Sequence, residues 1–382
     1  MRKTILSIFT IVALSLLPSC GSGNASHSGL GDPIELRHAN NLRMFAMGDT
    51  ATLVSLRNPW DTVRNMARYV LVERGHAVPD SLPAGTIAIT VPVERSVVYS
   101  GVHASLIDEL GALGTINGMC DVGYVNDGAA RNAIATGTIT DCGSSQSPNM
   151  ERIVSLHPQI IILSPYEKSD EAARFSRTGI SVVKAADYLE QTPLGRAEWM
   201  RFYAMRFFGR LYGKGSEADS LFNTIEKDYE SLRQKTARSE HRPAVLFDRI
   251  YSGVWDVPTA RSVTGRLIED AGGSNPFGKR RESGSAHFTA EEVLYNAQNA
   301  NIWLVRYFEP SLTLKSMKAD NPIYAKFKAF KNGNVFGANT LEKPLFEDGA
   351  FHPNLTLREM VRLLHPEIDN TPTVYYKKIQ AE

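Results

Sequence analysis

One stretch of the chain, residues 193–237, has a helical pattern throughout and contains no proline after its first residue. Apolar side chains recur within it at spacings of four, four and three residues, at Leu221, Ile225, Tyr229 and Leu232. This spacing places them on one face of a helix. A heptad pattern is not sustained, which argues against a coiled coil. We therefore predict one long α-helix, over residues 193–240, that joins two separately folded parts of the chain.

Short apolar runs alternate with helical patterns on both sides of this helix. The run at 160–163 is continuously apolar, which is typical of a parallel strand buried on both faces. The other runs lie at 97–99, 116–120, 181–184, 245–247, 302–305 and 334–336. Strands that alternate with helices predict a parallel sheet. The predicted fold class is therefore α/β, with two Rossmann-like, parallel-sheet lobes: an N-terminal lobe at 34–192 and a C-terminal lobe at 241–382.

The front of the N-terminal lobe has a different character from the rest. Residues 34–92 contain short β-prone runs that are separated by Pro59, Pro79 and Pro83. The strand–helix rhythm begins only after this region. We predict a β-rich N-terminal extension at 34–92 on the first lobe, followed by its α/β part at 93–192.

The beginning of the chain indicates export. Arg2 and Lys3 precede a largely apolar run of 13 residues, 5–17, which is too short to span a membrane and fits the core of a signal peptide. The run ends in Leu-Pro-Ser-Cys, which is similar to a bacterial lipobox, whose cysteine becomes the lipidated first residue. We predict a signal peptide at 1–19, lipidation at Cys20 and a flexible tether at 20–33. An ordinary cleaved secretory signal is the alternative.

Charge and motifs exclude several classes of function. The 382 residues include 42 Lys and Arg against 41 Asp and Glu, so no basic excess is present to neutralise the phosphates of a nucleic acid. The sequence has no GxSxG, P-loop or HExxH motif, and no GxGxxG after a strand. We therefore predict neither nucleic-acid binding nor an enzyme, and no catalytic residues.

Two cysteines, Cys120 and Cys142, remain after the one in the lipobox. An exported protein meets an oxidising compartment, in which such a pair can form a disulfide. Two buried free thiols are the alternative. No Cys or His spacing typical of a zinc site occurs, so no metal ligands are predicted.

Aromatic and polar side chains follow the predicted parallel strands of both lobes. In such folds the ligand lies in the crevice outside the carboxyl ends of the strands. Tyr and Trp offer rigid contact area with a polar tip, and Arg binds carboxylates through paired hydrogen bonds. A cleft lined in this way suits a bulky, rigid and partly anionic ligand. The predicted ligand-binding residues are Tyr99, Ser100, Tyr166, Arg249, Tyr251, Trp255, Arg306 and Tyr307.

Three further stretches lie on either side of the connecting helix, and their order along the chain matters for the comparison that follows. They are 96–111, then 141–143 together with 148–161, and then 289–294. The first is similar to the opening strand and helix of the class III solute-binding proteins of ABC importers. The second is similar to the signature of that family, and the third to its counterpart in the second lobe. The chain thus resembles this family over roughly 90–366, and its β-rich front resembles that of lipoprotein versions from the Bacteroidetes.

The resemblance implies a solute-binding lipoprotein at the periplasmic face of the cell envelope, held to the membrane only through Cys20. Its cleft would capture a metal chelate (a ferric siderophore, haem or cobalamin) with no cofactor of its own. It would deliver the chelate to an ABC permease dimer with its ATPase. Glu151 and Glu291, each in the first turn of a helix, would each pair with an arginine of one permease subunit, with Glu292 as the runner-up in the second lobe.

Other interpretations stay open. Glu151 and Glu291 can also serve only to stabilise helix ends, where the dipole favours a carboxylate. His103, at a helix start, is assigned a structural or supporting role ahead of a ligand contact. A zinc- or manganese-binding transporter protein is the main alternative function, followed by a secreted hydrolase and a purely structural lipoprotein. Core packing is the alternative role for each aromatic residue at a strand end.

Overall fold

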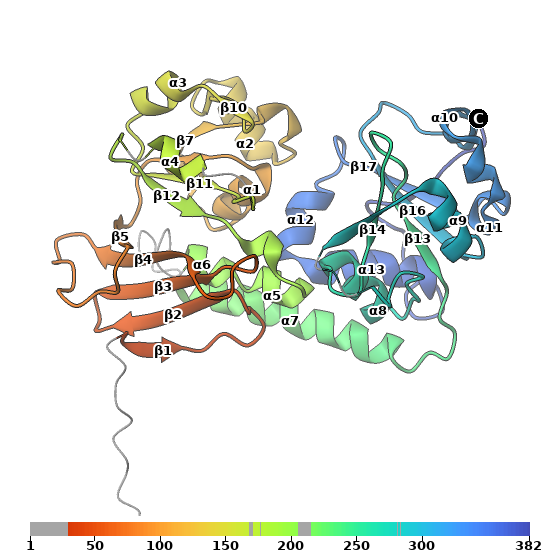
Figure 1. Cartoon of the computed structure of the whole chain (residues 1–382), viewed down its shortest axis with the longest axis horizontal. Helices are drawn as coiled ribbons and strands as arrows, with labels where there is room; N and C mark the ends of the chain where they lie inside the picture. Colours follow the sequence, from red (N-terminus) through yellow and green to blue (C-terminus); the bar gives the residue numbers. More distant parts are fainter. Residues whose placement is uncertain (1–29, 168–170, 176, 205–214, 281, 283) are drawn as a thin grey trace, which may run out of the picture.

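The computed structural model describes residues 30–167, 171–175, 177–204, 215–280, 282 and 284–382. The predicted signal peptide at 1–19, Cys20 and most of the predicted tether lie outside the described residues. Figure 1 shows two lobes side by side, connected along one edge by a long helix. The predicted fold class is confirmed, because each lobe contains a parallel sheet covered by helices.

The N-terminal lobe begins with a five-stranded sheet whose strands follow chain order. Neighbouring strands are antiparallel except for the last pair, which is parallel. Buried side chains on this sheet, such as Leu42, Val54 and Tyr69, belong to the same apolar core as the α/β part of the lobe. The β-rich extension is therefore packed onto the lobe. Its strands are β1 (Asp32–Ile34), β2 (Leu42–Met47), β3 (Ala51–Arg57), β4 (Asn65–Glu73) and β5 (Thr86–Val91).

The second sheet of the N-terminal lobe is parallel, with the order β12-β11-β6-β7-β8. Strand β11, which lies between β12 and β6, is IIIL in sequence and buried at every position, as its continuous apolar run predicts. The strands are β6 (Ser96–Val98), β7 (Ile116–Met119), β8 (Thr140–Asp141), β11 (Ile160–Leu163) and β12 (Ser181–Lys184), with the short ribbon β9 (Gly143–Ser144) and β10 (Ser147–Pro148) beside them. The helices are α1 (Gly101–Glu109), α2 (Gly128–Ala135), α3 (Met150–Ser155) and α4 (Glu171–Phe175).

The C-terminal lobe repeats this plan with a sheet in the order β13-β16-β17-β18. The first three strands are parallel, and the short last strand is antiparallel to its neighbour. The strands are β13 (Val245–Phe247), β16 (Ile302–Tyr307), β17 (Val335–Asn339) and β18 (Lys377–Lys378). A separate two-stranded antiparallel sheet consists of β14 (Trp255–Pro258) and β15 (Ser285–Phe288). The helices are α8 (Val263–Asp270), α9 (Ala290–Ala297), α10 (Leu314–Asp320), α11 (Lys328–Lys331), α12 (Leu345–Phe351) and α13 (Pro353–Leu364).

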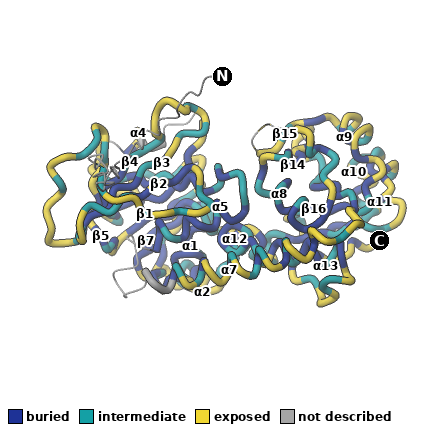
Figure 2. Tube along the Cα trace, turned by 90° about the horizontal axis from the view of Figure 1, so that it is seen from below, coloured by how far each residue is buried: buried dark blue, intermediate teal, exposed yellow. Residues whose placement is uncertain are grey.

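The connection between the lobes differs in detail from the single helix predicted over 193–240. The structure describes α5 (Pro193–Ala197), α6 (Met200–Phe202) and α7 (Gly215–Thr236) in this range. Three residues of the apolar stripe of α7 are buried and Leu221 is partly buried, and the stripe contributes to two cores. Ile225 belongs to the core of the N-terminal lobe, whereas Tyr229 and Leu232 belong to a core of the C-terminal lobe. Figure 2 shows buried and exposed residues alternating along α7.

A second junction joins the lobes through α12. Its last two residues, Ala350 and Phe351, are buried in the core of the N-terminal lobe. The backbone N–H of Asn126 donates to Glu347 Oε1 at 3.1 Å, and its side-chain amide donates to the carbonyl oxygen of Thr340 at 2.8 Å. His352 pairs with Glu109 on α1. The lobes are therefore held together at two separate places.

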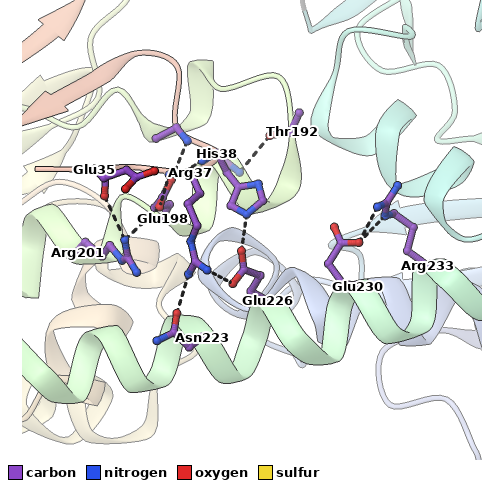
Figure 3. A network of polar contacts seen from close by, with 12 residues as sticks. Glu35, Arg37, His38, Thr192, Glu198, Arg201, Asn223, Glu226, Glu230 and Arg233 are labelled. Atoms are coloured by element: carbon purple, nitrogen blue, oxygen red, sulfur yellow. Dashed lines mark hydrogen bonds and ion pairs between the residues drawn. The ribbon is translucent and has the colours of Figure 1, made fainter. Parts of the chain in front are cut away.

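The segment between β1 and β2 is fixed to the connecting region by two buried carboxylates. The backbone N–H groups of Arg37, His38 and Ala39 donate to Glu198, at distances of 2.7 to 2.9 Å. Those of residues 40 and 41 donate to Glu190, which also accepts from the indole of Trp199. Figure 3 shows Arg37 and His38 reaching from this segment to Glu226 on α7. Because each buried carboxylate is satisfied by several donors, this attachment is rigid.

Candidate functional site

A cavity of about 380 Å³ lies at the carboxyl ends of β6 and β11 in the N-terminal lobe. Its lining includes three predicted residues, Tyr99, Ser100 and Tyr166. Ser100 also caps α1, because its Oγ accepts from the N–H of Val102 at 3.3 Å. Phe346 of the C-terminal lobe completes the wall. The first cavity is therefore formed by both lobes.

A second cavity, of about 440 Å³, lies at the carboxyl ends of β13 and β16 in the C-terminal lobe. The structure places four predicted residues in its lining: Arg249, Tyr251, Arg306 and Tyr307. Phe346 lines this cavity too. The two cavities thus meet at one aromatic ring, which is 47% exposed.

A narrower slot of about 90 Å³ also reaches Phe346. Arg196 of α5 and Arg306 of β16 both line it. Arg196 lines the first cavity as well, and Arg306 the second. These shared residues make the two cavities and the slot parts of one cleft.

Large aromatic side chains are exposed on both sides of this cleft. Tyr166 is 53% exposed and its ring lies 6.5 Å from that of Tyr188. Tyr251 is 66% exposed and meets Phe308 edge-on at 5.9 Å. Tyr124, also exposed, lines the first cavity. Exposed aromatic surface of this kind is typical of a site that stacks on a flat ligand.

The two arginines of the C-terminal lobe have carboxylate partners. Arg249 pairs with Glu309 and with Asp320, the latter at 3.2 Å. The Nε of Arg306 donates to both carboxylate oxygens of Asp248, at 3.1 and 3.2 Å. The guanidinium of Arg306 also lies over the ring of Phe346, 5.4 Å from its centre. Both arginines are therefore held in fixed positions at the edge of the second cavity.

Arg196 is a cleft residue that the sequence analysis missed. Its Nε donates to Asp187 Oδ2 at 3.0 Å, and Asp187 Oδ1 contacts His103 Nε2 at 2.8 Å. Burial alone would raise the pKa of the Asp187 carboxyl, but His103 and Arg196 lower it below its ordinary value. His103 is buried and supports Asp187, in line with the supporting role predicted for it. No motif marks Arg196, because it belongs to a helical stretch instead of a strand end.

Trp255 requires a correction, because the structure does not place it in the cleft. It is fully buried, its ring stacks on Trp303 at 5.6 Å, and its Nε1 donates to the carbonyl oxygen of Phe247 at 3.1 Å. The physical reason is strand alternation: Trp255 begins β14, where positions 255 and 257 face the core and 256 faces outward. The prediction counted Trp255 among the residues that follow the parallel strand at 245–247.

The two cysteines, Cys120 and Cys142, form no disulfide and adopt the alternative state, two buried free thiols. Burial raises the pKa of the Cys120 thiol to about 12 and that of Cys142 to about 11. Neither thiol has the thiolate character that would make it reactive.

The two predicted docking glutamates are exposed. Glu151 lies in the first turn of α3 and Glu291 in the first turn of α9. Each helix leads into a parallel strand, α3 into β11 and α9 into β16. Because such a helix runs opposite to the strands, its first turn lies at the carboxyl-end edge of the sheet, which is the edge that the cleft occupies. Glu292 instead closes the capping box of α9, with Oε2 accepting from the N–H of Thr289 at 2.8 Å.

No group of three or more His, Cys, Asp or Glu side chains among the described residues is arranged to hold a metal ion. In the same part of the chain, no helix has the length and apolar character needed to cross a membrane.

The chain is similar to known proteins in sequence and in fold. A family model described as periplasmic binding protein matches residues 97–340. An uncharacterized lipoprotein of Methanocaldococcus jannaschii is 28% identical over 359 residues, which is 87% of this chain and 82% of that protein.

Solved structures share the fold at low sequence identity. A periplasmic binding protein from Veillonella parvula has a TM-score of 0.59 at 13% identity, over 83% of this chain and 98% of that one. The periplasmic heme binding protein HutB of Vibrio cholerae has a TM-score of 0.54 at 19% identity, over 71% of this chain and 97% of that one.

Proposed function

The chain belongs to the periplasmic binding protein family, and from this premise we propose that its cleft captures a metal chelate for an ABC importer. One observation carries the proposal. Two cavities, of about 380 and 440 Å³, meet at Phe346 between the lobes. Each is within the size range of small-molecule sites, and together they suit a ligand larger than a bare ion.

The lining favours a rigid and partly anionic chelate. Tyr166 and Tyr251 offer exposed rings to a flat or bulky body, and the fixed Arg306 offers donors to anionic groups. We therefore place a ferric siderophore or haem ahead of cobalamin. A structural neighbour from Vibrio cholerae is described as heme binding, which supports this class of ligand. A zinc or manganese ion would instead need a cluster of His, Asp or Glu ligands.

A binding assay tests this function. The purified protein is titrated with ferric haem, a ferric siderophore, cobalamin, Zn²⁺ and Mn²⁺, and binding is followed by tryptophan fluorescence and visible absorption. We expect saturable binding of one chelate, and no comparable binding of a bare ion. Tyr166→Ala with Tyr251→Ala should weaken chelate binding by about 2 kcal/mol or more, because both are exposed aromatic anchors.

The matched control is Tyr295→Ala, an 83% exposed tyrosine on α9 outside the described cavities. It should bind the chelate as the unaltered protein does. Tight binding of Zn²⁺ or Mn²⁺ with no chelate bound would support the metal-transporter alternative and contradict the proposal.

We propose in addition that the protein is anchored by lipid on Cys20 at the periplasmic face of the envelope. The support is the lipobox-like end of the apolar run and the similarity to a protein named as a lipoprotein. A tether over 20–33 would let the lobes stand away from the membrane and reach a permease.

Little closure between the lobes is expected when the ligand binds. Two junctions resist rotation: α7 is buried in the cores of both lobes, and Phe351 of α12 is buried in the core of the N-terminal lobe. Small-angle X-ray scattering with and without the bound chelate should therefore give radii of gyration that agree within error. Phe351→Ala should loosen the second junction and serves as the contrast. A clear fall in the radius of gyration of the unaltered protein would contradict this prediction.

A further inference from the structure

The narrow slot beside Phe346 has an unusual composition for its size. Apolar residues such as Phe247, Leu267 and Met360 line it, and two arginines, Arg196 and Arg306, line it as well. Arg196 comes from the connecting region and Arg306 from the C-terminal sheet. At about 90 Å³ the slot has room for a short arm of a ligand but not for a whole chelate.

Both guanidinium groups are fixed before any ligand arrives. Arg196 keeps 23% of its side-chain surface exposed while its Nε is bound to Asp187, which is itself buried. Arg306 keeps 33% of its side-chain surface exposed while its Nε and Nη2 are bound to Asp248, which leaves its Nη1 free of this pair. A guanidinium has five N–H donors, so a carboxylate on its Nε edge leaves it able to donate elsewhere. Fixed donors cost little ordering entropy when they bind a partner.

We propose that this slot is a subsite for a short carboxylate arm of the chelate, which would lie between Arg196 and Arg306. The inference rests on the proposed function and deepens it, because it names the chemical class of the ligand. Apolar walls would bury the methylene groups of the arm, and the two guanidinium groups would bind its carboxylate. Neutral amide or ester arms would leave these donors without a charged acceptor in a partly buried site.

Paired ligands that differ only in the charge of their arms test the subsite. The probes are ferric haem, which has two propionate arms, and its dimethyl ester. Ferric citrate, a neutral ferric trihydroxamate and cobalamin complete the panel. We expect a carboxylate-bearing chelate to bind best and esterification to weaken haem binding by about 10- to 100-fold, the loss typical of one charge-assisted hydrogen-bonded group.

Variants show whether the slot causes this preference. Arg196→Gln should weaken binding of ferric haem by the same factor and leave binding of its dimethyl ester nearly unchanged. Arg196→Lys, which keeps the positive charge, should recover part of the lost affinity for ferric haem. The matched control is Arg74→Gln, which removes an ion-paired arginine of the N-terminal sheet that lies outside the described cavities. It should change neither affinity. Thermal unfolding of each variant verifies that the fold is retained.

The outcomes separate the two proposals. The proposed subsite is contradicted if a neutral chelate binds as tightly as a carboxylate-bearing one, or if Arg196→Gln weakens binding of ferric haem and of its ester equally. In either case the protein still binds chelates, and the proposed function stands. If no chelate in the panel binds, the proposed function fails, and the subsite fails with it.

Discussion

Replacement of Trp255 by alanine should lower the free energy of unfolding by about 3–5 kcal/mol, the usual cost of removing a buried large aromatic side chain. Trp255 is fully buried against Trp303, Tyr324 and Phe327, with ring centres 5.5 to 5.6 Å apart. The substitution would leave a cavity in this cluster and would remove the donor that satisfies the carbonyl oxygen of Phe247. Urea denaturation followed by circular dichroism measures the loss.

The matched control for this prediction is Trp60→Ala, because Trp60 is 38% exposed and lies outside the apolar cores. A surface change of this kind should alter the free energy of unfolding by no more than about 0.5 kcal/mol. Ligand affinity of the folded Trp255→Ala protein should be nearly unchanged. A loss of affinity without a loss of stability would instead return Trp255 to the cleft, where the sequence analysis placed it.

Seven of the eight residues that the sequence predicts at the carboxyl ends of parallel strands line the cleft. Tyr99 and Tyr166 follow β6 and β11, and Arg249 and Tyr251 follow β13. The rule that ligands bind at the carboxyl ends works because parallel strands of one sheet all end at the same edge. It failed for Trp255, since this residue starts β14, a strand of a separate small antiparallel sheet, and strand alternation turns its side chain inward. The partner strand β15 lies about thirty residues further along the chain, beyond α8, so no local pattern at Trp255 indicates this pairing.

Residues that reach the cleft from helices were beyond this rule. Arg196 lies in α5 and Phe346 in α12, and each lines a site formed mainly by distant strands. Their positions depend on how the lobes pack: α12 contacts the N-terminal lobe because Phe351 enters its core. Such tertiary contacts join residues far apart in the chain, and a local apolar pattern cannot identify them.

For the connecting helix, the sequence predicted the apolar face better than the ends of the helix. Its apolar stripe predicted a buried face correctly, and Ile225, Tyr229 and Leu232 are buried. The start of the helical stretch was predicted less well. Thr192 caps a separate short helix, α5, with Pro193 in its first turn, and two residues in a turn separate α5 from α6. Every residue of this stretch is compatible with a helix, so composition alone gave no reason to divide it.

The double variant Glu151→Arg, Glu291→Arg should abolish uptake of the ligand in cells while the isolated protein still binds it. Substrate-binding proteins of this family work with ABC permeases, and the two glutamates are exposed in matching first turns, of α3 and α9. We propose that each pairs with an arginine of one permease subunit. An exposed ion pair contributes only about 0–1 kcal/mol, so the pairs would set register and orientation. Reversal of both charges adds repulsion at each contact and should therefore have a larger effect than neutralisation.

Uptake of the labelled chelate in cells that depend on this protein measures the effect, and titration of the purified variant measures ligand affinity. The charge-matched control is Glu94→Arg with Glu367→Arg, which reverses one exposed glutamate in each lobe away from the first turns of α3 and α9. The control should transport normally, because a change in net charge alone would not misorient the lobes on a permease. Arginine in a first turn also opposes the helix dipole at a cost of about 0.3–1 kcal/mol, so the unfolding temperature of each variant must be compared.

The two glutamates line none of the described cavities, which is why ligand affinity separates the alternatives. Loss of affinity in the double variant would mean that the glutamates act on the ligand site. Normal transport would mean that they only stabilise the ends of α3 and α9. Loss of uptake with full ligand affinity is the result that a docking role requires, since only contact with the permease then remains to be broken.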